Sequence, residues 1–258
     1  METMEEWASF DAFTLDSVTN GNALVAVGMH FFPKVTFPSP VAPSQFRAFL
    51  LDLQAAYLDV PYHSRVHAAD VAQAAMWLIK DEPKFSGTSG IFLLAALAHD
   101  CGHFARTNAF LRSSGHPLVQ RLGPTSTLEY FHLEISTALL NKHKIFPMVE
   151  EPLFRKLVLA TDPAKKFPIT DEEALVMKAA DVNALARNFQ VGLKWGERFV
   201  QEISDQQLEE HKLVLPVSDV VGSSADFAKD YVLPLFDALA RVIPKVNNVV
   251  DTLVNIIK

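Results

Sequence analysis

Apolar residues recur every three or four positions along much of the chain, which is the spacing of amphipathic helices. Residues 46–58 and 68–79 follow this pattern, and residues 90–99 are apolar all round, as in a fully buried helix. The alternation typical of strands is nearly absent. Further helices are expected at Ser126–Asn141, Thr170–Ala180, Leu193–Ile203, Phe227–Val242 and Val246–Ile257. The pattern predicts an all-α fold, and we expect residues 1–258 to form a single domain.

Local signals mark where several of these helices begin and end. Ser126 with Glu129, and Thr170 with Glu173, have the spacing of capping boxes at helix N-termini. Most of the 15 prolines lie between the predicted helices, and one of them, Pro83, follows the second helical segment. These signals support the predicted helix boundaries.

Charge and cysteine content narrow the functional class. Lys and Arg number 23 against 30 Asp and Glu, a net charge of −7, so no basic surface for nucleic acid is expected. A small anionic substrate is still compatible with the negative net charge, because a bound metal can reverse the charge locally. Cys101 is the single cysteine, which excludes an intramolecular disulfide. With no signal-peptide pattern and no apolar run long enough to span a bilayer, a cytoplasmic protein is expected.

Residues suited to metal binding gather in three separated patches, at residues 62–70, 99–103 and 179–181. Imidazole nitrogens and carboxylate oxygens on rigid elements are ligands for divalent ions. His99 and Asp100 directly follow the buried helix, where such a pair is costly unless a metal compensates it. Each patch alone also fits an ordinary helix or a solvated helix end, so their joint occurrence carries the argument.

Five ordered blocks along the chain resemble motifs of one enzyme family, the class I cyclic nucleotide phosphodiesterases. The first block runs Tyr62-His63-Ser64-Arg65-Val66-His67-Ala68-Ala69-Asp70. The others are carried by His99, Asp100, His103, Asn108 and Phe110; by Leu128, Glu129 and His132; by Leu159-Ala160-Thr161-Asp162; and by Ala180-Asp181. Their order and rough spacing agree with the family from Trp7 to Arg241. The resemblance implies a multi-helix fold around one deep pocket that holds two metals.

The resemblance also assigns roles to the residues of these blocks. His67, His99, Asp100 and Asp181 match the ligands of the tighter ion, typically zinc, and Asp100 would bridge to a second ion, usually magnesium or manganese. Positions around these ligands, which hold water or support the cluster, are matched by His103, Glu129, His132, Thr161 and Asp162.

The implied reaction is hydrolysis of a cyclic phosphodiester by a hydroxide that bridges the two metals. His63 matches the general acid that protonates the departing 3′-oxygen, and Glu129 would orient or charge its imidazole. Tyr62 lies beside them in the sequence; it is expected at the edge of the substrate pocket, mainly as a packing residue.

The departures from the family pattern lie in the base pocket. Phe227 matches the aromatic residue that clamps the purine ring. The family's base-binding glutamine is replaced by Ser224, and an asparagine found in many members is replaced by Ala184. Asn183 could substitute for that asparagine. A serine hydroxyl cannot make the bidentate contact of an amide, so weaker or broader base selectivity is expected.

The sequence therefore predicts hydrolysis of cAMP, cGMP or both to the 5′-monophosphate. One alternative is a related metal-dependent phosphohydrolase that acts on another phosphodiester or nucleotide. A second is a non-catalytic module that binds cyclic nucleotide. The expected partner is a small-molecule cyclic nucleotide, with regulatory domains of a longer protein or a second copy of the chain as further candidates.

Overall fold

The computed structural model describes residues 2–145, 152–165, 170–211 and 226–257, and within these ranges it contains helices and no strand, which confirms the all-α prediction. The first half of the chain forms α1 (Ala12–Val18), α2 (Ala23–Phe31), α3 (Pro43–Ala56), α4 (Arg65–Ile79), α5 (Ser89–Ala98), α6 (Asn108–Ser113) and α7 (Pro117–Leu122). The second half forms α8 (Thr127–Lys142), α9 (Pro152–Ala160), α10 (Glu172–Asp181), α11 (Phe189–His211), α13 (Leu233–Ala240) and α14 (Asn247–Ile257).

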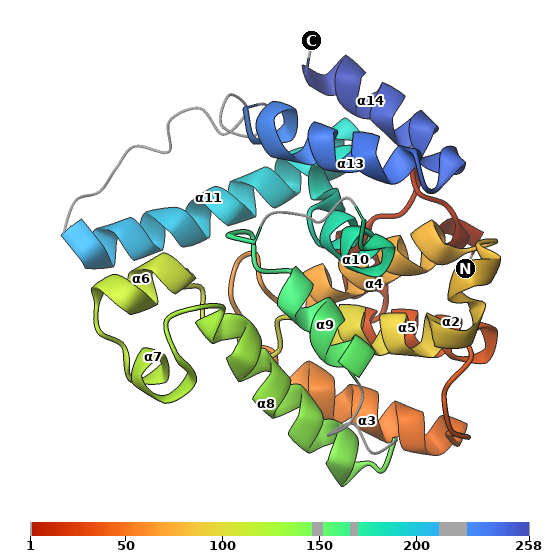
Figure 1. Ribbon diagram of the computed structural model, residues 1–258, viewed down its shortest axis with the longest axis horizontal. Helices are drawn as coiled ribbons and strands as arrows, with labels where there is room; N and C mark the ends of the chain where they lie inside the picture. The colour runs from red at the N-terminus through yellow and green to blue at the C-terminus, as the bar shows by residue number, and fades with distance from the viewer. Residues whose placement is uncertain (1, 146–151, 166–169, 212–225, 258) are drawn as a thin grey trace.

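Helices α4 and α5 lie at the centre of the helical assembly (Figure 1). Helix α4 packs against α5, α2 and α10, and α5 also packs against α9. Residues 90–98 of α5 are all buried, as the uninterrupted apolar run predicts. Because α4, α5 and α10 pack against one another, residues at their ends can meet in the interior although they are far apart in sequence.

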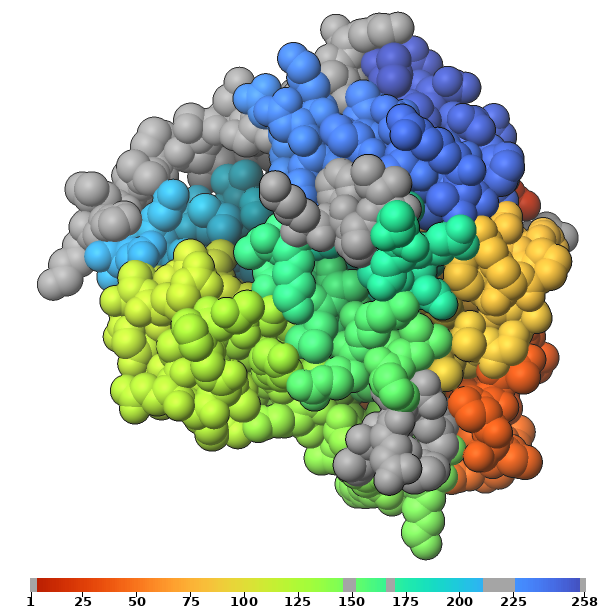
Figure 2. All heavy atoms as spheres, viewed as in Figure 1, coloured from red at the N-terminus to blue at the C-terminus, as the bar shows by residue number. Residues whose placement is uncertain are grey.

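Helix α11 extends from this centre past α6 (Figure 1). Its polar side chains hold the segment that follows α5: the side chain of Gln206 accepts from the Thr107 amide at 2.8 Å, and Glu209 pairs with Arg106. On the face shown in the space-filling view, α6 and α7 lie at one edge and the C-terminal helices lie at the other, with α9 between them (Figure 2). In the described part of the chain, no helix combines the length and apolar character that a membrane crossing requires.

Several predicted boundaries need correction. The Ser126 capping box is wrong: Ser126 has a left-handed φ of 51°, and its hydroxyl donates to Asp162 at 2.6 Å instead of capping α8. The cap of α10 is Asp171, which accepts from the Ala174 amide, and not Thr170. The continuous helix expected over residues 227–242 is a π-helical turn, Ala228–Val232, followed by α13.

Candidate metal centre and cavity

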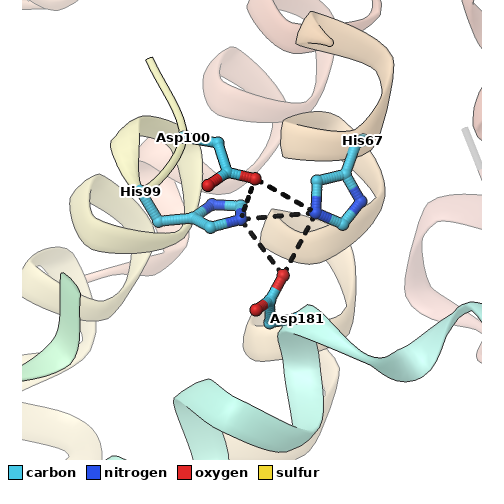
Figure 3. Close-up of side chains that lie close together, drawn as sticks. All are labelled: His67, His99, Asp100 and Asp181. Carbon is cyan, nitrogen blue, oxygen red and sulfur yellow. Dashed lines mark hydrogen bonds and ion pairs between the residues drawn. The ribbon is translucent and has the colours of Figure 1, made fainter. Parts of the chain in front are cut away.

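Four side chains from three helices converge at the core. His67 comes from α4, His99 and Asp100 follow the C-terminal end of α5, and Asp181 ends α10 (Figure 3). The Nε2 atoms of His67 and His99 are 3.3 Å apart. Asp181 Oδ1 lies 3.1 Å from His67 Nε2 and 3.2 Å from His99 Nε2. The four residues that the sequence predicted as ligands therefore face one another.

The distances between these donor atoms fit a shared divalent cation. Asp100 Oδ2 lies 3.1 Å from His99 Nε2 and 3.6 Å from His67 Nε2. Metal–ligand bonds of about 2.0–2.2 Å at tetrahedral or octahedral angles separate neighbouring donors by about 3.0–3.5 Å. The cluster thus has the spacing of a coordination sphere.

The chemistry of the donor set supports the same conclusion. The ring of His99 donates from Nδ1 to the Ala96 carbonyl at 2.9 Å, which directs Nε2 at the cluster. Burial alone would lower the pKa of His99, but the charges and hydrogen bonds of Asp100 and Asp181 raise it well above its ordinary value. One buried carboxylate, Asp100, and one partly buried carboxylate, Asp181, therefore favour a positive charge at this position, which a divalent cation supplies.

The turn after α5 needs a glycine. Gly102 has a φ of +81°, and a Cβ at this position would lie 2.4 Å from Ile135 Cδ1 of α8. Glycine adopts this left-handed conformation without strain and leaves room for the Ile135 side chain. This turn brings His103 back toward the cluster one residue later.

A cavity of about 820 Å³ opens beside the cluster and is lined by residues from all the matched blocks. The predicted residues that line it are Tyr62, His63, Asp100, His103, Glu129, His132, Thr161, Asp162, Asp181, Ala184 and Phe227. His67 and His99 lie behind this lining and are fully or almost fully buried. Ser224 lies outside the described residues.

His63 faces a carboxylate that the sequence analysis did not nominate. Its Nδ1 donates to Glu202 Oε2 at 2.6 Å, and Glu202 Oε1 accepts from the amides of Tyr62 and His63 at 2.7 and 2.9 Å. Burial opposes protonation of His63, yet the Glu202 hydrogen bond and the nearby carboxylates raise its pKa above the usual value. The His63 ring is therefore held in place and favoured in its charged form.

This pair corrects the role predicted for Glu129. In the described structure, the hydrogen bonds to the Glu129 carboxylate come from the Asn108 amide, at 3.2 and 3.0 Å, and not from His63. Burial raises the pKa of Glu129 to about 7, although the Asn108 hydrogen bond opposes the shift. Asn108 also accepts from the Leu128 amide at 3.0 Å and so ties α6 to the start of α8.

His103 lies against His63 with a ring-centroid distance of 4.0 Å and an interplanar angle of 21°. Its Nδ1 accepts from the Ala105 amide at 3.1 Å, so the proton of the neutral ring is on Nε2. Burial and the adjacent charge of His63 lower the pKa of His103 well below its usual value. The neutral imidazole of His103 therefore stacks on the imidazole of His63, whose protonated form is favoured.

Three more predicted residues occupy positions that refine their expected roles. The His132 ring donates from Nδ1 to the Cys101 carbonyl at 2.8 Å, and its Nε2 lies 3.7 Å from Asp100 Oδ1. The Thr161 hydroxyl donates to the Val158 carbonyl at 2.8 Å. The carboxylate of Asp162 accepts from Ser126 and from the Ala164 amide, rather than from the histidines it was expected to support.

The two neighbouring residues considered for the base pocket, Asn183 and Ala184, differ in where their side chains lie. Asn183 is fully buried and donates to the Ala180 carbonyl at 2.7 Å, so it turns away from the cavity and does not substitute for the missing asparagine. Ala184 lines the cavity instead. Tyr62 both lines the cavity and packs on His67, with ring centroids 4.7 Å apart, as its expected packing role requires.

Comparison with known proteins points to one family. A family model described as 3′5′-cyclic nucleotide phosphodiesterase matches residues 62–174 and 168–253. The chain is 28% identical to high affinity cAMP-specific and IBMX-insensitive 3′,5′-cyclic phosphodiesterase 8 of Drosophila melanogaster, over 95% of this chain and 30% of the relative. It is 27% identical to phosphodiesterase 8A of the same description from Homo sapiens, over 95% of this chain and 34% of the relative.

A third relative aligns with a smaller part of the chain. The chain is 27% identical to 3′,5′-cyclic-nucleotide phosphodiesterase 2 of Saccharomyces cerevisiae, over 71% of this chain and 39% of the relative. The chain spans about a third of the length of these curated relatives. The family model, however, covers most of the chain, including the four converging ligands, His63 and Glu202. The chain therefore belongs to the 3′,5′-cyclic nucleotide phosphodiesterase family.

Proposed function

We propose that the chain hydrolyses 3′,5′-cyclic nucleotides to 5′-nucleoside monophosphates. The observation that carries the proposal is a single cavity lined by Asp100 and Asp181 of the four-ligand cluster and by the His63–Glu202 pair. The curated relatives named for cyclic phosphodiester hydrolysis support the same reaction. Water adds to the phosphorus atom, the bond from phosphorus to the 3′-oxygen breaks, and the 3′-oxygen takes up a proton.

Two divalent cations fit the proposal. His67, His99, Asp100 and Asp181 would hold the tighter ion, for which zinc is the natural candidate given two imidazole ligands. Asp100 would share a second ion, magnesium or manganese, with water molecules positioned by His103, Glu129 and Thr161. When bound, such ions supply Lewis acidity and lower the pKa of water.

The residues of this chain have distinct parts in the reaction. His63, charged through Glu202, donates its Nε2 proton to the departing 3′-oxygen. Neutral His103 beside it limits the positive charge around that imidazole. Phe227, which also lines the cavity, provides an aromatic face for the base. Binding, orientation and proton transfer are thus divided among separate side chains.

The test is turnover of cAMP and cGMP by the purified protein supplied with Zn²⁺ and Mg²⁺. Hydrolysis to the 5′-monophosphate is expected, and His63→Ala should lower kcat by about 10²–10⁴ without changing the metal content. Hydrolysis of acyclic phosphodiesters at rates equal to those of cyclic nucleotides would favour a related phosphohydrolase. Binding of cyclic nucleotide without any product would favour a non-catalytic role.

A further inference from the structure

A lysine lies inside the core one helical turn before a ligand of the cluster. Lys178 belongs to α10 and precedes Asp181 by three residues. Its side chain is 2% exposed, and its neighbours on the helix, from Leu175 to Ala180, are also buried. Moving an ammonium group out of water is costly unless charges or hydrogen bonds compensate it. Lys178 therefore requires partners in the interior.

The ammonium group of Lys178 has its partners beside the cavity. Its Nζ donates to the main-chain carbonyl of Asp162 at 2.7 Å and lies 6.0 Å from the ring centroid of Tyr231. Burial lowers the pKa of Lys178, although the negative charges of surrounding carboxylates oppose the shift. These carboxylates belong to Asp181, Asp162 and Glu129. One buried cation thus connects α10 to two segments that line the cavity.

The turn that Lys178 holds follows α9 and contributes four consecutive residues, 161–164, to the cavity lining. The Asp162 carboxylate fixes one side of this turn, because it accepts from the Ser126 hydroxyl at 2.6 Å. Ser126 directly precedes α8, so that bond ties the turn to α8. The bond from Lys178 to the Asp162 carbonyl ties the same turn to α10, the helix that ends in a cluster ligand.

Thr161 is the residue of this turn to which the proposed reaction assigns a part, the positioning of water at the second divalent ion. Its hydroxyl donates to the Val158 carbonyl at 2.8 Å, which leaves the hydroxyl oxygen able to accept hydrogen bonds at the cavity. Loss of such an outer partner of a metal site typically lowers metal affinity by about 10- to 100-fold. The place of Thr161 relative to the cluster depends on what holds the turn.

We propose that Lys178 is a positioning residue for the second divalent ion, because it holds the turn at residues 161–164 against α10 and so keeps Thr161 in place beside the cluster. The inference rests on the proposed function, of which the second ion is a part. Among the described residues, Lys178 does not belong to the cavity lining, so it acts through the turn and does not touch the substrate.

The charge of Lys178 allows its two possible effects to be told apart by their sign. An ammonium group near carboxylates repels a divalent cation, so its removal would strengthen cation binding if charge alone mattered. Loss of the hydrogen bond to Asp162 acts in the opposite direction, because it releases the turn. Weaker binding of the second ion after a neutral substitution therefore reports the position of the turn and not the lost charge.

The experiment measures Mn²⁺ binding to the zinc-loaded full chain, from the EPR signal of the free ion, in the wild type and in Lys178→Met. Methionine is an unbranched side chain without a donor. The Kd for Mn²⁺ is expected to rise by about 10- to 100-fold in Lys178→Met, and the zinc content should not change because the four cluster ligands remain. An unchanged or lower Kd overturns the inference.

Two further variants separate positioning from a general loss of stability. Lys178→Gln is neutral but keeps an N–H donor, so its Kd should lie between those of the wild type and Lys178→Met; equal values in the two variants overturn the inference. If Lys178→Met does not fold, Lys178→Gln should still raise the Kd about threefold or more, as a weakened hydrogen bond requires, and an unchanged Kd overturns the inference. Val176→Ala removes buried apolar atoms from the same helix, so it should lower Tm and leave the Kd unchanged; a rise like that of Lys178→Met overturns the inference.

Turnover of cAMP and cGMP in the same samples separates this inference from the proposed function. If the wild type binds Mn²⁺ but forms no 5′-monophosphate, the proposed function fails, and the Kd values still decide the role of Lys178. If the wild type is active and Lys178→Met binds Mn²⁺ equally well, the proposed function stands and the inference alone is overturned. A wild type that binds no Mn²⁺ overturns the inference whether or not it is active.

Discussion

Replacing the Glu202 carboxylate by an amide tests how His63 is charged and oriented. Glu202→Gln keeps the shape of the side chain but removes the negative charge that accepts from His63 Nδ1 at 2.6 Å. Hydrogen bonds to charged groups are worth about 1.5–3 kcal/mol, and 1.4 kcal/mol corresponds to a factor of ten. We therefore expect kcat for cyclic nucleotide to fall by about 10- to 100-fold.

The pH profile should change in a defined direction. His63 must be protonated to act as an acid, and Glu202 raises its pKa. Removing the carboxylate lowers that pKa, so the alkaline decline in kcat/KM should begin at lower pH in Glu202→Gln than in the wild type. Asp205→Asn on the exposed face of α11 is the matched control and should leave the profile in place.

A substrate with a better leaving group separates acid catalysis from a general structural defect. The p-nitrophenolate ion departs without protonation, so Glu202→Gln should lower turnover of bis(p-nitrophenyl) phosphate far less than turnover of cyclic nucleotide. Equal losses on both substrates, or an unshifted alkaline limb, would refute the assigned role of the pair.

Three further predictions concern stability. Ala105 has a left-handed φ of 58°, so Ala105→Gly should raise the free energy of unfolding by about 1 kcal/mol, seen as a Tm increase of about 2–4 °C; a lower Tm contradicts it. Arg187 is buried and pairs with Asp70 at 3.2 Å, so Arg187→Met should cost about 3–5 kcal/mol in urea unfolding, and a loss below 1 kcal/mol contradicts the pairing. Asn108→Ala removes the hydrogen-bond partner of Glu129 and of the start of α8, so it should lower the free energy of unfolding in urea by about 1–3 kcal/mol. It should also lower kcat, and an unchanged kcat would argue against a role for Glu129.

The ligand cluster could be predicted from the sequence because its chemistry is concentrated at helix ends. A histidine and an aspartate directly after a fully apolar helix require compensation in any fold that buries that helix. His99 and Asp100 meet this description, and the packing of α5 against α4 and α10 brings His67 and Asp181 to them. The all-α class followed from the apolar spacing in the same direct way.

Glu202 could not be predicted with the same ease, because its partner His63 lies 139 residues earlier in the chain. A signal was nevertheless present. On α11, Val191 and Trp195 define a buried face, and Glu202 and Gln206 continue it at helical spacing. A carboxylate on a buried face requires a partner, so this position could have been nominated.

Other details depended on local backbone geometry and distant side chains. Ala184 lines the cavity as expected, but Asn183 turns to the Ala180 carbonyl, because α10 ends at Asp181 and a 3-10 turn, Asn183–Ala186, follows it. The Ser126 hydroxyl leaves its expected capping position because Asp162, 36 residues later, accepts from it. The residue pattern of a single segment reveals neither the turn after α10 nor the distant acceptor of the Ser126 hydroxyl.

The central claim is that four converging side chains bind a divalent cation on which hydrolysis depends. Metal analysis of the purified protein, after dialysis with Zn²⁺, should find zinc in the wild type and its loss in Asp181→Ala, together with loss of cyclic nucleotide turnover. Glu197→Ala, which removes an exposed carboxylate on α11 outside the cavity lining, should retain both metal and turnover. Full metal content and undiminished hydrolysis in Asp181→Ala would contradict the claim.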